Sequence, residues 1–154
     1  MKINWKALII SLLIPLAVGG AAALLSRTGM ADYENAIKPP LSPPAWLFPV
    51  AWTILYLLMG YSSYLVWTAN DPKGRSALLL YTVQLFVNFL WPILFFGLKL
   101  RLTAFFWLVL LWVLVYLTIR QFSNISERAG DLLLPYILWL TFAGYLNLGA
   151  FILN

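Results

Sequence analysis

The sequence contains no cysteine and no histidine. The chain therefore cannot form disulfides, thiolate nucleophiles or Cys/His metal sites, and it has no imidazole for acid–base catalysis. Charge is scarce too, since 10% of the 154 residues are charged, whereas a soluble domain carries about 25%. We predict no metal site. Every acidic residue lies outside the long apolar stretches, so conventional catalysis within a membrane is not expected.

The charge that is present is mostly positive, with a net charge of +5. Nucleic-acid binding would need a clustered basic patch, but the Lys and Arg residues stand singly or in pairs. Such positions suit the ends of membrane spans, so we expect no nucleic-acid partner. In a five-span protein the N-terminal side would carry Lys2, Lys6, Lys73, Arg75, Arg120 and Arg128, and the other side Arg27, Lys38, Lys99 and Arg101. This distribution favours a cytoplasmic N-terminus.

Five stretches without charged side chains dominate the chain, at residues 7–26, 39–70, 76–98, 102–119 and 132–154. A helix of about 20 apolar residues crosses the hydrocarbon of a bilayer, and backbone groups there must be paired within the helix. We therefore predict an all-α membrane protein with one domain, a bundle of five transmembrane helices at about 5–26, 45–69, 77–98, 102–121 and 132–152. The first apolar run is longer than a signal-peptide core, so we expect this helix to be retained.

The longest connection is expected at residues 27–44, and it ends in Pro39-Pro40-Leu41-Ser42-Pro43-Pro44. Four prolines in six residues exclude a helix interior. Connections of this length are usually functional or disordered. We interpret it as a lid over one end of the bundle.

Three of the predicted helices carry a stripe of aromatic, amide and small residues at helical spacing. The stripes are Trp52, Tyr56, Gly60, Ser63 and Trp67; Tyr81, Gln84, Asn88, Trp91 and Phe95; and Tyr136, Trp139, Ala143 and Asn147. An amide facing lipid is costly, so these stripes should point inward. They could serve only to bond the helices together. We favour a shared cavity for a flat, apolar ligand.

Tryptophan is abundant, with eight residues. A belt at the membrane interface accounts for Trp5, Trp46, Trp67 and Trp107, which lie near span ends. It accounts less well for Trp52, Trp91, Trp112 and Trp139, which lie further inside the spans. Gly19 and Ala23 form a small-residue pair that lets another helix approach closely, within the bundle or in a dimer.

These residues, taken in order, resemble a known family. The relevant segments are Lys38-Pro39, Pro43-Pro44, Phe48, Trp52 and Leu55-Tyr56; then Tyr81, Gln84-Leu85, Asn88, Trp91 and Phe95-Phe96; then Pro135-Tyr136, Trp139, Ala143 and Leu146-Asn147. Together they resemble the translocator protein family, also called tryptophan-rich sensory proteins and formerly peripheral benzodiazepine receptors. The match covers nearly the whole chain.

The resemblance implies a five-helix bundle, often a homodimer, in a bacterial cell membrane. It implies a pocket under the first long loop that binds porphyrins such as protoporphyrin IX, and synthetic benzodiazepine-type and isoquinoline ligands. No cofactor would be required, and protoporphyrin IX would be a ligand or a substrate. Carried over residue by residue, the pocket would comprise Ala23, Tyr33, Pro43, Pro44, Phe48, Trp52, Tyr56, Asn88, Trp91, Trp139, Ala143 and Leu146.

One departure concerns the sterol motif of animal members, in which a basic residue follows a tyrosine at the end of the fifth helix. Here no basic residue follows Tyr145, so sterol binding there is not implied. The same loose pattern occurs at Leu114, Tyr116 and Arg120, which shows how unspecific it is.

Three functions fit this sequence. The first is a membrane receptor that binds porphyrins and senses stress. The second is light-dependent porphyrin degradation, in which Trp52 and Trp139 would be the electron donors. The alternative is a transporter of tetrapyrroles or other lipophilic solutes, which lacks support because the spans contain no charge and no inverted repeat.

Overall fold

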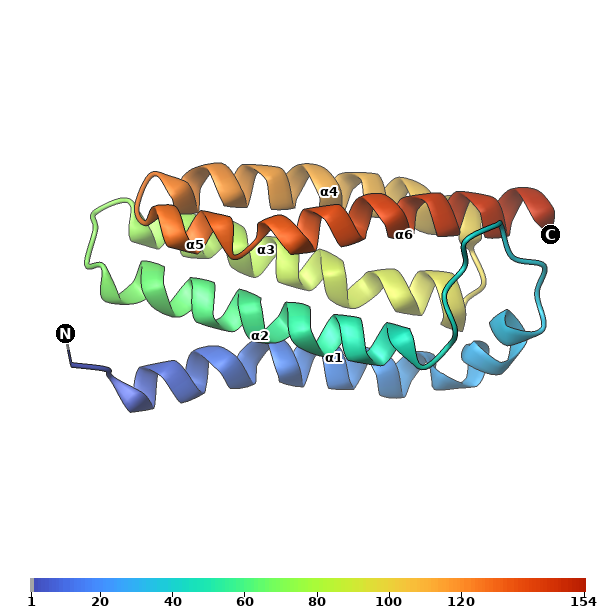
Figure 1. The fold of residues 1–154 in the computed structure, drawn as a ribbon, viewed down its shortest axis with the longest axis horizontal. Helices are drawn as coiled ribbons and strands as arrows, with labels where there is room; N and C mark the ends of the chain where they lie inside the picture. The colour runs from blue at the N-terminus through green and yellow to red at the C-terminus, as the bar shows by residue number, and fades with distance from the viewer. Residues whose placement is uncertain (1) are drawn as a thin grey trace.

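The computed structural model describes residues 2–154 and shows a bundle of long helices (Figure 1). The helices are α1 (Trp5–Glu34), α2 (Leu47–Thr68), α3 (Gly74–Pro92), α4 (Arg101–Ser123), α5 (Glu127–Asp131) and α6 (Leu134–Leu153). A π-helical segment, η1 (Ile93–Gly97), continues α3. Five helical stretches in residues 2–154 are long and apolar enough to span a membrane. The predicted all-α bundle with five spans is confirmed.

Successive spans run in opposite directions, so both ends of the bundle carry connections. The N-terminus lies at one end, and the C-terminus lies at the other, beside the connection from α1 to α2 (Figure 1). We call that connection, residues 35–46, the lid. In the ring of helices α1 contacts α2 and α3, α4 contacts α3 and α6, and α2 contacts α5.

The first helix is longer than predicted. The sequence suggested an end at residue 26, because Arg27 is charged, and placed residues 27–44 in the loop. In the structure α1 continues to Glu34, and its first turn is capped by the Asn4 side chain, which accepts a hydrogen bond from the Ala7 amide at 3.2 Å. A charged residue marks the edge of the apolar slab, and a helix free of proline at that point can continue beyond it.

The third span ends in a wider turn than an α-helix. Pro92 lacks an amide proton and cannot make the usual bond to residue 88. In the following η1 segment the Leu98 amide donates to the Ile93 carbonyl at 2.8 Å, five residues back. Such π segments widen a helix locally and occur often at functional sites.

The fifth span is divided. The Ser126 side chain caps α5 by accepting from the Ala129 amide at 3.3 Å. Residues 132–133 then interrupt the helix before α6 begins at Leu134, with Pro135 in its first turn, where the missing amide proton has no cost.

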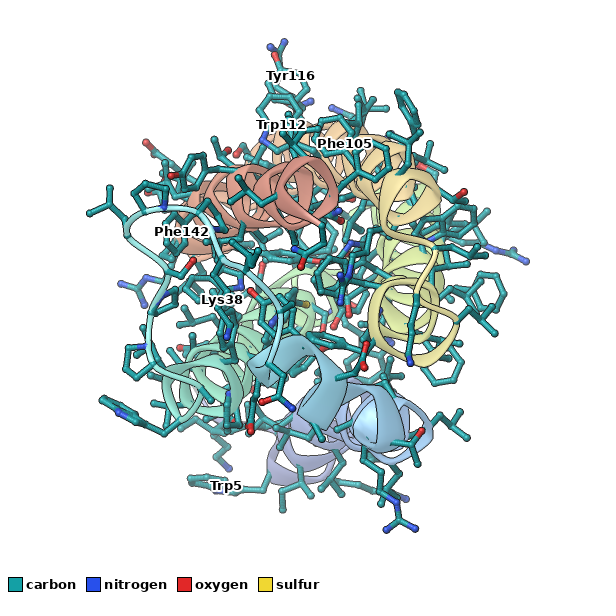
Figure 2. All side chains as sticks on the ribbon, turned by 90° about the vertical axis from the view of Figure 1, so that its right-hand side faces the viewer. Trp5, Lys38, Phe105, Trp112, Tyr116 and Phe142 are labelled. Atoms are coloured by element: carbon teal, nitrogen blue, oxygen red, sulfur yellow. The ribbon has the colours of Figure 1, made fainter. Side chains whose placement is uncertain are left out.

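Trp112 lies on the outside of the bundle. Figure 2 shows Trp112 and Tyr116 projecting outward from α4. The Trp112 indole donates to Thr141 Oγ1 at 2.9 Å, which satisfies its N–H in a lipid-facing position. The other three tryptophans that the sequence places inside the spans, Trp52, Trp91 and Trp139, lie instead at the cavities described below.

Candidate functional site

A cavity of about 910 Å³ lies between α1, α2, the end of α3 and the lid. We call it the main cavity. Pockets for small molecules usually measure roughly 300–1,000 Å³, so its size suits a large ligand. Residues 16–34 of α1 form one wall, and residues 48–56 of α2 form another. Asn88, Trp91, Pro92 and Phe96 close the inner side.

Glycine residues allow close approaches between α1 and its neighbours. Near its middle, Gly19 lies against the Tyr56 ring, and the backbone of Ser11 and Leu12 lies against Gly60. Near its end, Gly29 lies directly on the backbone carbonyl of Phe96. The glycines allow these close approaches because they have no side chain. The space between these contacts is the main cavity.

A second, much smaller cavity of about 20 Å³ lies deeper, against α6. We call it the inner cavity. Five aromatic residues line both cavities, and we call them the aromatic partition: Tyr33, Phe48, Trp52, Trp91 and Phe96. Four of these rings pack edge to face. Tyr33 contacts Phe48 and Phe96, with the centroids of Tyr33 and Phe96 5.4 Å apart, and Trp91 contacts Phe96. These five residues therefore lie at the boundary between the two cavities.

Nine of the twelve predicted pocket residues line the main cavity: Ala23, Tyr33, Pro43, Pro44, Phe48, Trp52, Tyr56, Asn88 and Trp91. The three from α6, Trp139, Ala143 and Leu146, line the inner cavity instead. Trp139 contacts the aromatic partition, with its ring centroid 6.4 Å from Trp52 and 6.1 Å from Phe48. Its indole Nε1 is buried and has no hydrogen-bond partner within the described residues.

The amides of the stripes hold the helices together. Tyr56 donates its hydroxyl proton to Asn88 Oδ1 at 2.7 Å, and Asn88 Nδ2 donates to the Tyr136 hydroxyl at 2.7 Å. Tyr136 in turn donates to Gln84 Oε1 at 2.8 Å. This chain joins α2, α3 and α6, and it supports the interhelical role considered for the amides. Of the two amide residues in this chain, Gln84 and Asn88, Asn88 also lines the main cavity.

Asn147 has a similar role nearer the lid. Its Oδ1 accepts from the Trp91 indole at 3.0 Å, and its Nδ2 donates to the Arg101 carbonyl at 2.8 Å. The second bond joins α6 to the backbone at the start of α4. The Trp91 ring is thereby fixed in the aromatic partition, stacked on Phe95 with centroids 5.2 Å apart.

Several lining residues were not predicted from the sequence, chiefly Arg27, Met30 and Glu34 on α1 and Phe96 on η1. The first three lie in the part of α1 that was predicted to be loop. Together with Gly19, Ala23 and Tyr33 they recur at the spacing of one helix face, so a longer helix would have revealed them. Nothing in the sequence indicated the π segment that carries Phe96.

The fold and the cavity define a class: a multi-pass integral membrane protein with a ligand-sized, aromatic cavity under a lid. The chain belongs to the TspO/MBR family, whose profile matches residues 11–153. The chain is 38% identical to the tryptophan-rich sensory protein of Cereibacter sphaeroides, over 100% of this chain and 95% of the relative. It is 37% identical to the tryptophan-rich protein TspO of Chlorobaculum tepidum, over 90% of each chain. It is also 37% identical to the translocator protein of Bos taurus, over 88% of this chain and 82% of the relative.

Proposed function

We propose that this protein is a membrane receptor that binds protoporphyrin IX, or a tetrapyrrole of similar shape, in the main cavity. The observation that carries the proposal is the combination of a volume near 910 Å³ with walls of aromatic rings. Trp52 and Tyr56 stack with ring centroids 5.6 Å apart and both line this space. Flat π-systems favour offset stacking on such rings, which suits a porphyrin plane.

The charged side chains of the main cavity lie toward the lid. Arg27 and Lys38 line it there, together with the single acid Glu34. Protoporphyrin IX is an apolar disc with two carboxylates on one edge. An apolar wall with cations at one end matches that distribution of charge, because cations attract carboxylates while the disc stays out of water.

The proposal predicts saturable binding that tryptophan fluorescence reports. Titration of purified protein with protoporphyrin IX should quench the emission, because the ligand would lie against Trp52. Replacing both Trp52 and Trp139 by Phe should remove most of the saturable part. The matched control replaces Trp67 and Trp112, two exposed rings outside both cavities, by Phe. No saturation in the unmodified protein, or equal quenching in both double variants, would contradict the proposal.

The charge argument predicts a difference between two ligands. Arg27→Gln should weaken binding of protoporphyrin IX by about 2- to 5-fold, the range expected for an exposed ion pair. It should leave binding of protoporphyrin dimethyl ester unchanged, because the ester carries no carboxylate. Arg75→Gln, at the opposite end of the bundle, serves as the control. An equal loss for both ligands would assign Arg27 a role other than charge recognition.

Light-dependent degradation is a second candidate, favoured by the position of two tryptophans. Trp52 would give an electron to the photoexcited porphyrin, becoming an oxidised radical while the porphyrin is reduced. Dioxygen would then add to the porphyrin radical anion at a methine bridge, and return of one electron to the Trp52 radical would leave a neutral O2 adduct. Cleavage of the O–O and C–C bonds of that adduct would open the ring as a dicarbonyl product. Trp139, 6.4 Å from Trp52 by ring centroids, would share the Trp52 radical in the meantime. Illumination of the complex in air should yield a defined product, which Trp52→Phe should suppress. Bleaching at the rate seen in detergent alone would count against this activity.

A further inference from the structure

The lid connects α1 to α2, but it is also hydrogen-bonded to the C-terminal end of α6. Figure 1 shows the lid passing the C-terminal end of α6 on its way from α1 to α2. Three residues of α6 and its cap make the contacts, namely Tyr145, Gly149 and Asn154. We call these three residues the latch. None of them lines the main or the inner cavity.

Asn154 pairs with both backbone groups of one lid residue. Its Oδ1 accepts from the Ile37 amide at 3.0 Å, and its Nδ2 donates to the Ile37 carbonyl at 2.8 Å. The same Nδ2 also donates to the Ala150 carbonyl at 2.8 Å, which fixes the side chain to the last turn of α6. A neighbouring β-strand would bond Ile37 in a similar way. Both bonds to Ile37 involve its backbone, so they do not depend on which side chain the lid carries at this position.

Tyr145 and Gly149 hold the next residues of the lid. The Tyr145 hydroxyl donates to the Pro40 carbonyl at 2.7 Å. Gly149 lies under the Pro39 ring so closely that a Cβ at this position would come within 2.5 Å of Pro39 Cγ. Tyr145 and Gly149 are four residues apart and so share one face of α6. The proline ring is stiff and cannot move aside as a flexible side chain would.

The anchored lid residues lie next to lid residues that line the main cavity. Ile37, Pro39 and Pro40 contact the latch, whereas Lys38 and Pro43 line the cavity. We propose that Tyr145, Gly149 and Asn154 are positioning residues that hold the lid over the main cavity, so that α6 governs how often the cavity opens. The proposal rests on the proposed function only for the identity of the ligand. It also gives Tyr145 a role that requires no sterol.

The first test observes the lid without any ligand. Because the chain has no native cysteine, Leu41→Cys provides a single site for a spin label, one residue after Pro40 and 84% exposed. We expect the label to become more mobile in Tyr145→Phe, Asn154→Ala and Gly149→Ala backgrounds. Tyr61→Phe and Asn124→Ala are matched controls, because they remove the same groups from exposed positions outside the lid and should leave the mobility unchanged.

The second test measures release of protoporphyrin IX by stopped flow. Loss of one hydrogen bond from the latch should raise the dissociation rate of protoporphyrin IX by about 3- to 10-fold. Tyr145→Phe removes a single oxygen from a partly exposed side chain, so it should fold normally, which circular dichroism checks. Unchanged label mobility in folded latch variants, or equal change in the controls, would overturn the proposal. If protoporphyrin IX does not bind at all but the label is released in the latch variants, the latch is supported and the proposed ligand is wrong.

Discussion

Asn88 is the residue at which the framework of the bundle meets the main cavity. Both of its side-chain polar atoms are used, one by Tyr56 and the other by Tyr136. It is nearly completely buried, yet it lines the cavity beside Trp91. An amide is suited to this position because it donates and accepts at once and therefore satisfies two tyrosines on two other helices.

Asn88→Ala should destabilise the protein by about 1–3 kcal/mol, since two buried hydroxyls lose a partner and interhelical bonds in membranes are individually modest. Thermal unfolding in detergent, followed by circular dichroism, measures the effect. Thr82→Ala is the control on the same helix, because Thr82 is exposed and bonds only to the Leu78 carbonyl of its own helix. Equal melting temperatures for Asn88→Ala and the control would show that the bonded chain contributes little.

Among the elements, α1 is the one whose position defines the main cavity. Its most apolar stretch is 11% buried, the lowest share of the five spans, although α1 contacts α2, α3 and η1. It approaches η1 through Gly29, and beyond that point Asp32 forms an ion pair of 3.4 Å with Lys99. That pair is exposed and therefore contributes little. Besides the Tyr33 ring, which packs on Phe95 and Phe96, the glycine contact should therefore determine how closely α1 approaches η1.

Two glycine substitutions in α1 should have opposite effects on stability. In Gly29→Ala the added methyl group would overlap the Phe96 carbonyl, so α1 must shift, at a cost of about 1–3 kcal/mol. In Gly20→Ala the methyl group meets nothing within 4 Å, and the higher helix propensity of alanine should stabilise α1 by up to about 1 kcal/mol. Thermal unfolding of both variants decides this. A neutral Gly29→Ala would mean that α1 adjusts freely against η1.

On the scale of the whole molecule, the two ends differ in how many cations they carry. At the lid end, Lys38 lies over the Tyr33 ring, and Arg101 over the Phe95 ring. The opposite end carries more Lys and Arg residues, as the sequence indicated. Cytoplasmic loops of membrane proteins are enriched in these residues, so the lid should face away from the cytoplasm.

Labelling of single cysteines in intact bacterial cells tests this orientation. A membrane-impermeant maleimide should modify Leu41→Cys in the lid without lysis. It should modify Asn124→Cys, at the other end of the bundle, only after the cells are opened. The unmodified chain, which lacks cysteine, gives the background. The reverse pattern of labelling would place the lid in the cytoplasm.

The sequence predicted those features that follow from the bilayer and from helix periodicity. Five apolar stretches gave five spans, and helical spacing placed Asn88 and Trp91 on an inward face. The end of α1 was predicted wrongly, because Arg27 ends the apolar run while the helix goes on to Glu34. The separation of Trp139 from the main cavity depends on how Phe48 and its neighbouring rings pack. Such packing is a three-dimensional property that no local pattern encodes.

The aromatic partition makes the size of the site adjustable. It consists of residues from α1, α2, α3 and η1, and Trp52 and Phe48 line both the main and the inner cavity. Rotation about χ angles is far easier than movement of a helix. A ligand with a protruding group could displace a ring and extend toward Ala143 and Leu146, whereas a compact ligand would leave the wall intact. Chemically unrelated molecules could therefore share one binding site, each selecting its own depth.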